Sequence, residues 1–276
     1  MAEVTPFNIT DDIIIGPGHP LTILAGPCVL EEQSIVDEVA GTMKDICARL
    51  GVNYIYKSSF DKANRTSIHS FRGPGLEKGI EQFKLIKERH NVPIVSDVHE
   101  ASQCAPLAEV VDILQIPAFL CRQTDLLLAA AATGKTLNIK KGQFMAPGDM
   151  ASVLTKMREV NHAKVALCER GTTFGYNNLV VDMRGLQIMR ELGAPIIFDA
   201  THSVQLPGGQ GTKSGGQPEF IPALSRAAAA VGIDGVFMEV HPEPSKALSD
   251  AANTLRLSEV EENLKRLVDI HRLVNS

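Results

Sequence analysis

The chain of 276 residues is 44% apolar and 21% charged, so it can bury a sizeable core and lacks the composition of a disordered protein. Its formal net charge of −5 argues against a nucleic-acid-binding surface, and no apolar run approaches the roughly 20 residues that a membrane span needs. Five cysteines without a C-x-x-C pair, and an N-terminus without a basic and apolar leader, favour a reduced, cytoplasmic setting.

The first element that the sequence predicts is a β-hairpin in FNITDDIIIGPGHPLT, at residues 7–22. Glycine and proline are typical turn residues, so we expect this hairpin to turn at residues 16–20. Ahead of a barrel, such a hairpin would plug the N-terminal mouth.

Eight short apolar runs follow, and each ends in polar residues before an amphipathic stretch begins. The runs are LTILAGPC, NYIYKSSF, VPIVSDVHE, VDILQIPAF, TLNIKKGQF, KVALCERGT, PIIFDATHS and GVFMEVHPE. Apolar residues at helical spacing after the first run predict a helix that Gly51 ends. The last helix is expected to begin with the capping pair Ser258 and Glu261.

Strands that alternate with helices imply parallel pairing and right-handed crossovers. Eight such units predict an α/β fold, a single (β/α)8 TIM-barrel domain over residues 1–276 that includes the N-terminal β-hairpin. An open Rossmann-like sheet is the alternative. It is weakened because Gly16 and Gly18 are followed by Leu21, where a G-x-G-x-x-G fingerprint needs its third glycine.

Charged residues gather at the C-terminal ends of the predicted strands, where barrel enzymes carry their active sites. The cations are Lys57, Lys62, Arg65, Arg122, Lys140 and Arg170. They would repel one another without an anionic ligand, and each phosphate monoester carries about −1.5 to −2 charges. We therefore expect a phosphate-rich ligand or pair of ligands. The glycine-rich stretch 206–217 is a candidate lid.

A possible metal site lies where the barrel closes on its first strand. Cys28 follows that strand, and His202, Glu239 and Asp250 lie at or beyond the ends of the seventh and eighth. A thiol, an imidazole and two carboxylates suit a divalent ion such as zinc, iron or manganese. The alternative is a buried core thiol beside unrelated polar residues, since free cysteine is often buried.

Four longer motifs carry a resemblance to a known family. They are KSSFDKANRTS (57–67), NIKKGQFMAP (138–147), ERGTTFGYNNLVVDMR (169–184) and FDATHSVQLPGG (198–209). The chain resembles the 3-deoxy-D-manno-octulosonate 8-phosphate synthases along nearly its whole length. The resemblance implies condensation of phosphoenolpyruvate with D-arabinose 5-phosphate and release of phosphate, in the pathway to the inner core of Gram-negative lipopolysaccharide.

The resemblance also implies roles for individual residues. Phosphoenolpyruvate would be held by Lys62, Gln115, Lys140 and Arg170, with Lys57 near its carboxylate. Arabinose 5-phosphate would be received by Asn64, Arg65, Thr66 and Asp97, with Arg65 on the phosphate and Asp97 on the hydroxyls. The catalytic residues would be Lys62, Asp97, Lys140 and His202. The family forms homotetramers, and Arg122 would reach a neighbouring subunit's site.

The family divides into a metal-free class, with Asn at the position of Cys28, and a metal-dependent class with Cys. The resemblance therefore implies a divalent metal held by Cys28, His202, Glu239 and Asp250. One departure concerns Ala251, where the family usually has Gly. If the backbone there has positive φ, an alanine is strained and the presentation of Asp250 changes.

Two other functions compete with this one. A 3-deoxy-D-arabino-heptulosonate 7-phosphate synthase uses erythrose 4-phosphate and carries Lys-Pro-Arg-Thr where this chain has Lys-Ala-Asn-Arg-Thr at residues 62–66. The extra residue removes the rigidity of proline and displaces the arginine, which suits a sugar one carbon longer. A non-catalytic sugar-phosphate-binding barrel would not need both a metal set and two anion sites.

Overall fold

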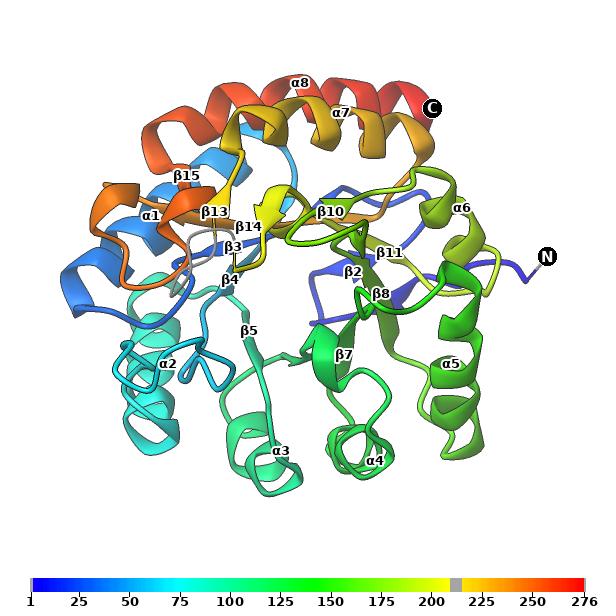
Figure 1. Cartoon of the computed structure of the whole chain (residues 1–276), viewed down its shortest axis with the longest axis horizontal. Helices are drawn as coiled ribbons and strands as arrows, with labels where there is room; N and C mark the ends of the chain where they lie inside the picture. Colours follow the sequence, from blue (N-terminus) through cyan, green and yellow to red (C-terminus); the bar gives the residue numbers. More distant parts are fainter. Residues whose placement is uncertain (1, 209–214, 276) are drawn as a thin grey trace.

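Eight parallel strands form the centre of the protein, which a computed structural model describes at residues 2–208 and 215–275 (Figure 1). These strands are β3 (Thr22–Gly26), β4 (Asn53–Lys57), β5 (Ile94–Asp97), β6 (Ile113–Ile116), β7 (Thr136–Lys140), β8 (Val165–Glu169), β11 (Ile196–Asp199) and β14 (Gly235–His241). Each comes from one of the eight apolar runs. The ring closes because β14 pairs in parallel with both β11 and β3.

In the part of the chain that the structure describes, eight helices surround this ring (Figure 1). They are α1 (Gln33–Leu50), α2 (Leu76–His90), α3 (Ala101–Ala108), α4 (Thr124–Ala132), α5 (Met150–Glu159), α6 (Arg184–Arg190), α7 (Ile221–Val231) and α8 (Val260–Val274). The predicted TIM barrel is therefore confirmed, and the open sheet is excluded. No helix among the described residues is long and apolar enough to cross a membrane.

Short elements decorate the loops. The additional strands are β9 (Thr172–Thr173), β10 (Leu179–Val180), β12 (Gln205–Leu206), β13 (Gly215–Gly216) and β15 (Leu255–Arg256). The 3-10 turns are η1 (Ala118–Leu120), η2 (Pro147–Asp149), η3 (His202–Val204), η4 (Pro218–Phe220), η5 (Pro244–Lys246), η6 (Ala251–Asn253) and η7 (Leu257–Glu259). Residues 209–214 of the predicted lid lie outside the described residues, so that role stays a prediction.

The strands divide the core in two, because successive side chains point to opposite faces. Leu24 of β3 points into the barrel, where it packs with Ile55, Val95 and Phe237. Its neighbours on β3 belong to the larger core between strands and helices. Strands buried on both faces are expected to be apolar throughout, which is why the runs were recognisable in the sequence.

The N-terminal hairpin is confirmed, but its predicted turn at residues 16–20 is wrong. Strands β1 (Phe7–Asn8) and β2 (Ile14–Ile15) pair antiparallel, and the chain turns at residues 9–13, around two exposed aspartates. This register lets Ile15 enter the inner core, whereas residues 16–20 only connect the hairpin to β3. The hairpin also contacts the N-terminal end of β4, where the Asn53 amide donates to the Ile14 carbonyl at 3.4 Å. It thus covers the N-terminal mouth.

Two predictions about helix ends have different outcomes. Helix α1 ends before Gly51, which has φ 64°, as predicted. The predicted capping pair of α8 is wrong, because the helix begins at Val260 and its N-cap is Glu259, without a side-chain cap. Ser258 lies in η7, and Glu261 instead forms an ion pair with Arg49 of α1 at 2.7 Å.

Gly26 ends β3 where no side chain fits. A Cβ there would lie 2.0 Å from the carbonyl oxygen of Lys57 on the neighbouring strand. We expect Gly26→Ala to force the two strands apart and to cost about 1–3 kcal/mol of unfolding free energy or more. Thermal unfolding measures this loss. Gly148→Ala, at a glycine with no atom within 4 Å of an added Cβ, is the matched control, and an equal effect of both substitutions would contradict the explanation.

Candidate active site

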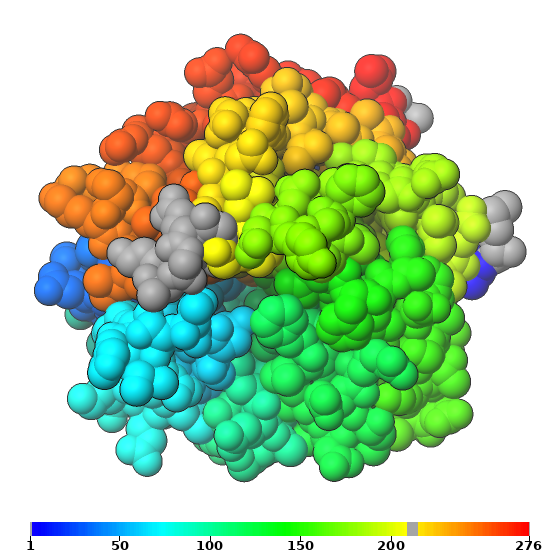
Figure 2. All heavy atoms as spheres, viewed as in Figure 1, coloured from blue at the N-terminus to red at the C-terminus, as the bar shows by residue number. Residues whose placement is uncertain are grey.

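A cavity of about 890 Å³ opens at the C-terminal ends of the barrel strands. Figure 2 shows this end of the barrel, with residues 60–75 in cyan and the loops after β7 and β8 in green around its centre. The predicted site residues that line the cavity are Lys57, Lys62, Asn64, Arg65, Thr66, Asp97, Gln115, Lys140, Arg170, His202, Glu239 and Asp250. Residues from seven of the eight strand ends or following loops are thus brought together as predicted.

Two predicted residues do not line this cavity. Cys28 is buried beside it, and its thiol donates to Asp250 Oδ2 at 3.5 Å. Arg122 is exposed on the segment between η1 and α4, and its backbone carbonyl accepts a hydrogen bond from Lys156. Its guanidinium therefore belongs to the surface of this chain and not to its own cavity.

One side of the cavity carries two buried cations at the ends of β7 and β8. Lys140 donates to Asp199 at 2.5 Å, and its ammonium lies 3.6 Å from the centre of the Phe237 ring. Arg170 donates from Nη2 to the Gln205 amide oxygen at 2.8 Å, while its buried Nη1 has no hydrogen-bond partner among the described residues. Burial lowers the pKa of Arg170, but a guanidinium keeps its charge. This unpaired donor belongs to a side chain that lines the cavity.

A second cationic group lies on the loop after β4. Arg65 donates from Nη1 to the Ser249 hydroxyl at 2.7 Å and from Nη2 to the Leu248 carbonyl at 3.2 Å. Lys62, on the same loop, has its ammonium 3.7 Å from Glu239. Strands β4 and β8 stand opposite each other in the ring, since three strands separate them in either direction. The two cationic groups therefore approach the cavity from opposite strands.

Two acceptors lie between these groups, at the ends of β5 and β6. Asp97 accepts from His99 Nε2 at 2.9 Å through Oδ2, while its buried Oδ1 has no partner among the described residues. Burial opposes ionisation of Asp97, but the hydrogen bond and the charge of His99 outweigh it, so the pKa of Asp97 lies below its ordinary value. Gln115 accepts from Asn138 at 3.1 Å, which fixes its amide.

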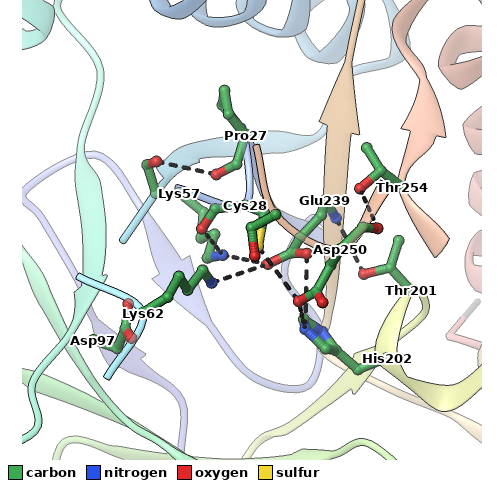
Figure 3. A network of polar contacts seen from close by, with 12 residues as sticks. Pro27, Cys28, Lys57, Lys62, Asp97, Thr201, His202, Glu239, Asp250 and Thr254 are labelled. Atoms are coloured by element: carbon green, nitrogen blue, oxygen red, sulfur yellow. Dashed lines mark hydrogen bonds and ion pairs between the residues drawn. The ribbon is translucent and has the colours of Figure 1, made fainter. Parts of the chain in front are cut away.

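The predicted metal ligands come together in one cluster (Figure 3). Ligand atoms of Cys28, Glu239 and Asp250 all lie within 4.8 Å of one another. His202 Nε2 lies 3.7 Å from a carboxylate oxygen of Glu239 and 3.7 Å from one of Asp250. The buried Oε2 of Glu239 has no hydrogen-bond donor among the described residues. This donor set fits a divalent ion of borderline softness.

Lys57 ties this cluster to the cavity. Its ammonium donates to Glu239 Oε1 at 2.6 Å and to the Cys28 carbonyl at 3.1 Å (Figure 3). Burial alone would raise the pKa of Glu239, but the charge of Lys57, followed by those of His202 and Lys62, outweighs burial and holds this pKa well below its ordinary value. Glu239 is therefore a carboxylate at neutral pH, as metal binding requires.

The concern about Ala251 does not apply to this backbone. The residue with positive φ is Asp250 itself, at 49°, and Ala251 begins the 3-10 turn η6. Aspartate enters the left-handed region more readily than alanine does, because its side chain can hydrogen-bond locally. The Asp250 carbonyl also accepts a hydrogen bond from the Thr254 hydroxyl at 3.0 Å, which holds the turn.

Sequence reasoning gave no role to several residues that organise the site. These residues are Asp199, His99, Gln205 and Ser249. Gln205 contacts both Arg170 and Asp250, and Ser249 holds Arg65. No local pattern distinguishes such residues. The contacts of Gln205 and Ser249 span 35 to 184 positions in the sequence, so only the folded chain shows them.

Comparison with known proteins places this site in a family. The DAHP synthetase I family matches residues 4–276. The 2-dehydro-3-deoxyphosphooctonate aldolase of Desulfotalea psychrophila is 56% identical over 278 residues, 99% of either chain. The proteins of that name from Fusobacterium nucleatum subsp. nucleatum and Syntrophotalea carbinolica are 57% and 56% identical over 263 residues, 95% of either chain. The chain belongs to the DAHP synthetase I family and, within it, to the 2-dehydro-3-deoxyphosphooctonate aldolases, also called 3-deoxy-D-manno-octulosonate 8-phosphate synthases.

Proposed function

We propose that this protein condenses phosphoenolpyruvate with D-arabinose 5-phosphate and water, giving 3-deoxy-D-manno-octulosonate 8-phosphate and phosphate for the lipopolysaccharide inner core. The observation that carries the proposal is one cavity with cationic groups on two opposing strands and a thiol–imidazole–carboxylate cluster beside them. Two phosphorylated substrates need two such anion sites. The names of relatives at 56–57% identity support the same reaction.

Phosphoenolpyruvate is assigned to the β7 and β8 side. Lys140 and Arg170 meet its phosphate there, and the open Nη1 of Arg170 can donate to it. Gln115 and Lys62 complete its binding, with Lys57 near the carboxylate. These side chains are nearly all buried and held by neighbours, so little reorganisation accompanies the developing charge of the leaving phosphate.

Arabinose 5-phosphate is assigned to the loop after β4. Arg65 binds its phosphate, with Asn64 and Thr66, which are exposed to the cavity, beside it. Asp97 accepts from the sugar hydroxyls through its open Oδ1. With the sugar phosphate held at Arg65, the aldehyde carbon points toward phosphoenolpyruvate. Holding the two reacting carbons in this orientation lowers the entropic part of the barrier to bond formation.

The reaction joins C3 of phosphoenolpyruvate to the aldehyde carbon while water adds at C2, and phosphate then leaves C2 by cleavage of the C–O bond. Lys62 stabilises the negative charge that the aldehyde oxygen acquires. Cys28, His202, Glu239 and Asp250 would hold a divalent metal, in keeping with the metal-dependent class of the family. Such an ion supplies Lewis-acid polarisation of an oxygen atom when bound.

The proposed domain organisation, oligomeric state and compartment of the protein follow from the same family membership. We propose that residues 1–276 act as a single barrel domain, that the protein is a cytoplasmic homotetramer, and that the exposed Arg122 serves a neighbouring subunit's site. All five cysteines are free and buried, which is compatible with a reducing compartment. The alternative substrate, erythrose 4-phosphate, is disfavoured by the names of the close relatives and by the inserted residue in the loop that carries Arg65.

Substituting one anion-binding arginine at a time tests the two subsites. Arg65→Ala should raise KM for arabinose 5-phosphate about 10–100-fold and change KM for phosphoenolpyruvate little, since charge-assisted hydrogen bonds to one substrate are lost. Arg170→Ala should show the opposite bias. Arg72→Ala, on the same loop as Arg65 but exposed and paired with Asp61, is the control. Equal losses for both substrates in both variants would contradict the assignment.

Metal removal tests the ligand cluster. A chelator should abolish turnover, and added divalent ion should restore it. Cys28→Ala should lower the metal content of the purified protein, whereas Cys104→Ala, at a buried cysteine of α3, should leave it unchanged. Cys28→Asn imitates the metal-free class and should retain part of its activity in chelator. Wild-type enzyme that works at full rate without metal would show that Cys28 only fills space.

The fate of the bridging oxygen tests the bond that breaks. Phosphoenolpyruvate labelled with ¹⁸O between C2 and phosphorus should pass its label to inorganic phosphate, because phosphate leaves with C–O cleavage. Mass spectrometry of the two products follows the label. Retention of the label in the keto sugar would indicate P–O cleavage and would exclude the proposed route.

A further inference from the structure

Asp199 connects the two halves of the active site through one carboxylate. It is the last residue of β11, and none of its surface is exposed. Its Oδ2 accepts from Lys140 Nζ at 2.5 Å, and His202 Nδ1 lies 2.8 Å from Oδ2 and 3.0 Å from Oδ1. The same carboxylate therefore meets a cation assigned to phosphoenolpyruvate and a predicted metal ligand.

Lys140 gives Asp199 a charged partner from outside its own loop. The oxygen Oδ1 accepts from the Thr201 hydroxyl at 3.3 Å and from the His202 backbone N–H at 3.0 Å, both neutral donors of the same loop. Lys140 reaches Oδ2 from β7, across the intervening strand β8. The long-range contact therefore adds charge compensation that the neutral donors of the loop do not supply.

The contact with Asp199 orients the imidazole of His202. A neutral imidazole that donates its Nδ1 proton to Asp199 keeps its lone pair on Nε2, the nitrogen that faces Glu239 and Asp250. A carboxylate behind a ligating histidine orients the ring and makes it a stronger donor. The positive charge of Lys140 neutralises part of the negative charge of Asp199. Asp199 therefore strengthens His202 as a metal ligand less than an unpaired carboxylate would.

We propose that Asp199 is a positioning residue that couples binding of phosphoenolpyruvate to binding of the metal. When the substrate phosphate engages Lys140, the ammonium shares its charge with the phosphate, and Asp199 supports His202 more fully. Metal affinity then rises, and by reciprocity the bound metal strengthens binding of phosphoenolpyruvate. The inference rests on the proposed function, because it places the substrate phosphate at Lys140.

Titration of the protein with Co²⁺ tests the coupling without turnover. The absorption band of a cobalt–thiolate bond reports Cys28 coordination, and arabinose 5-phosphate is left out. In wild-type protein, phosphoenolpyruvate should tighten Co²⁺ binding about fivefold or more. In Asp199→Asn, Co²⁺ should bind about 10–100-fold more weakly, and phosphoenolpyruvate should no longer change its affinity.

Asp234→Asn is the matched control, because Asp234 is a buried carboxylate at the N-terminal end of the barrel, paired with Arg190, and its bonds among the described residues involve neither Lys140 nor His202. It should keep the coupling. Lys140→Met gives an independent measurement should Asp199→Asn fail to fold: without any substrate it should bind Co²⁺ more tightly than wild type. Unchanged or weaker Co²⁺ binding in Lys140→Met would overturn the proposal.

The outcomes separate this inference from the proposed function. If calorimetry shows that wild-type protein does not bind phosphoenolpyruvate, the proposed function fails. If wild-type protein binds both ligands but neither affects the other, or if Asp199→Asn retains the coupling, the inference fails and the function stands. If phosphoenolpyruvate no longer changes Co²⁺ affinity in Asp199→Asn but still does so in the control variant, the inference is supported.

Discussion

The Lys57 ammonium and the Glu239 carboxylate meet at 2.6 Å in the barrel mouth, where their side chains are 1% and 0% exposed. A buried charge without a partner is strongly destabilising, so each member of this pair fixes the other. Their strands, β4 and β14, are both neighbours of β3, and Cys28 follows β3. The pair therefore spans the seam at which the barrel closes and sets the distance between the proposed metal ligands and the loop after β4.

The same requirement for charge compensation governs the rest of the mouth. Asp199 is compensated by Lys140 and His202, and Asp97 by His99. Two donors of cationic side chains have no partner among the described residues: Nη1 of Arg170 and the buried Nε of Arg65. These two donors approach from opposite strands, so an anion bound to one leaves the other available. The two donors thus lie on opposite sides of the barrel mouth.

Much of this arrangement was predictable because barrel strands and their ends are local features. The eight apolar runs gave the strands, and the polar residue at each strand end had to face a common mouth. The hairpin turn was mispredicted because a tertiary contact decided it: Ile15 enters the inner core. The start of α8 was mispredicted because the 3-10 turn η7 includes Ser258 ahead of the helix. The ion pair of Glu261 with Arg49 joins two exposed side chains, and such pairs contribute little stability.

Adjacent charges at a strand end show why composition alone cannot assign a site. Lys140 and Lys141 are consecutive, as are Glu169 and Arg170 on the next strand. Because side chains alternate across a strand, only one of each pair can enter the cavity. Lys140 and Arg170 do so, whereas Lys141 lies fully buried 3.5 Å from Glu169 and donates to the Thr172 hydroxyl. Lys140 and Arg170 line the cavity. Lys141 and Glu169 lie behind them and join β7 to the loop after β8. The period of the strand, not the number of cations, therefore determines how many positive charges the cavity presents.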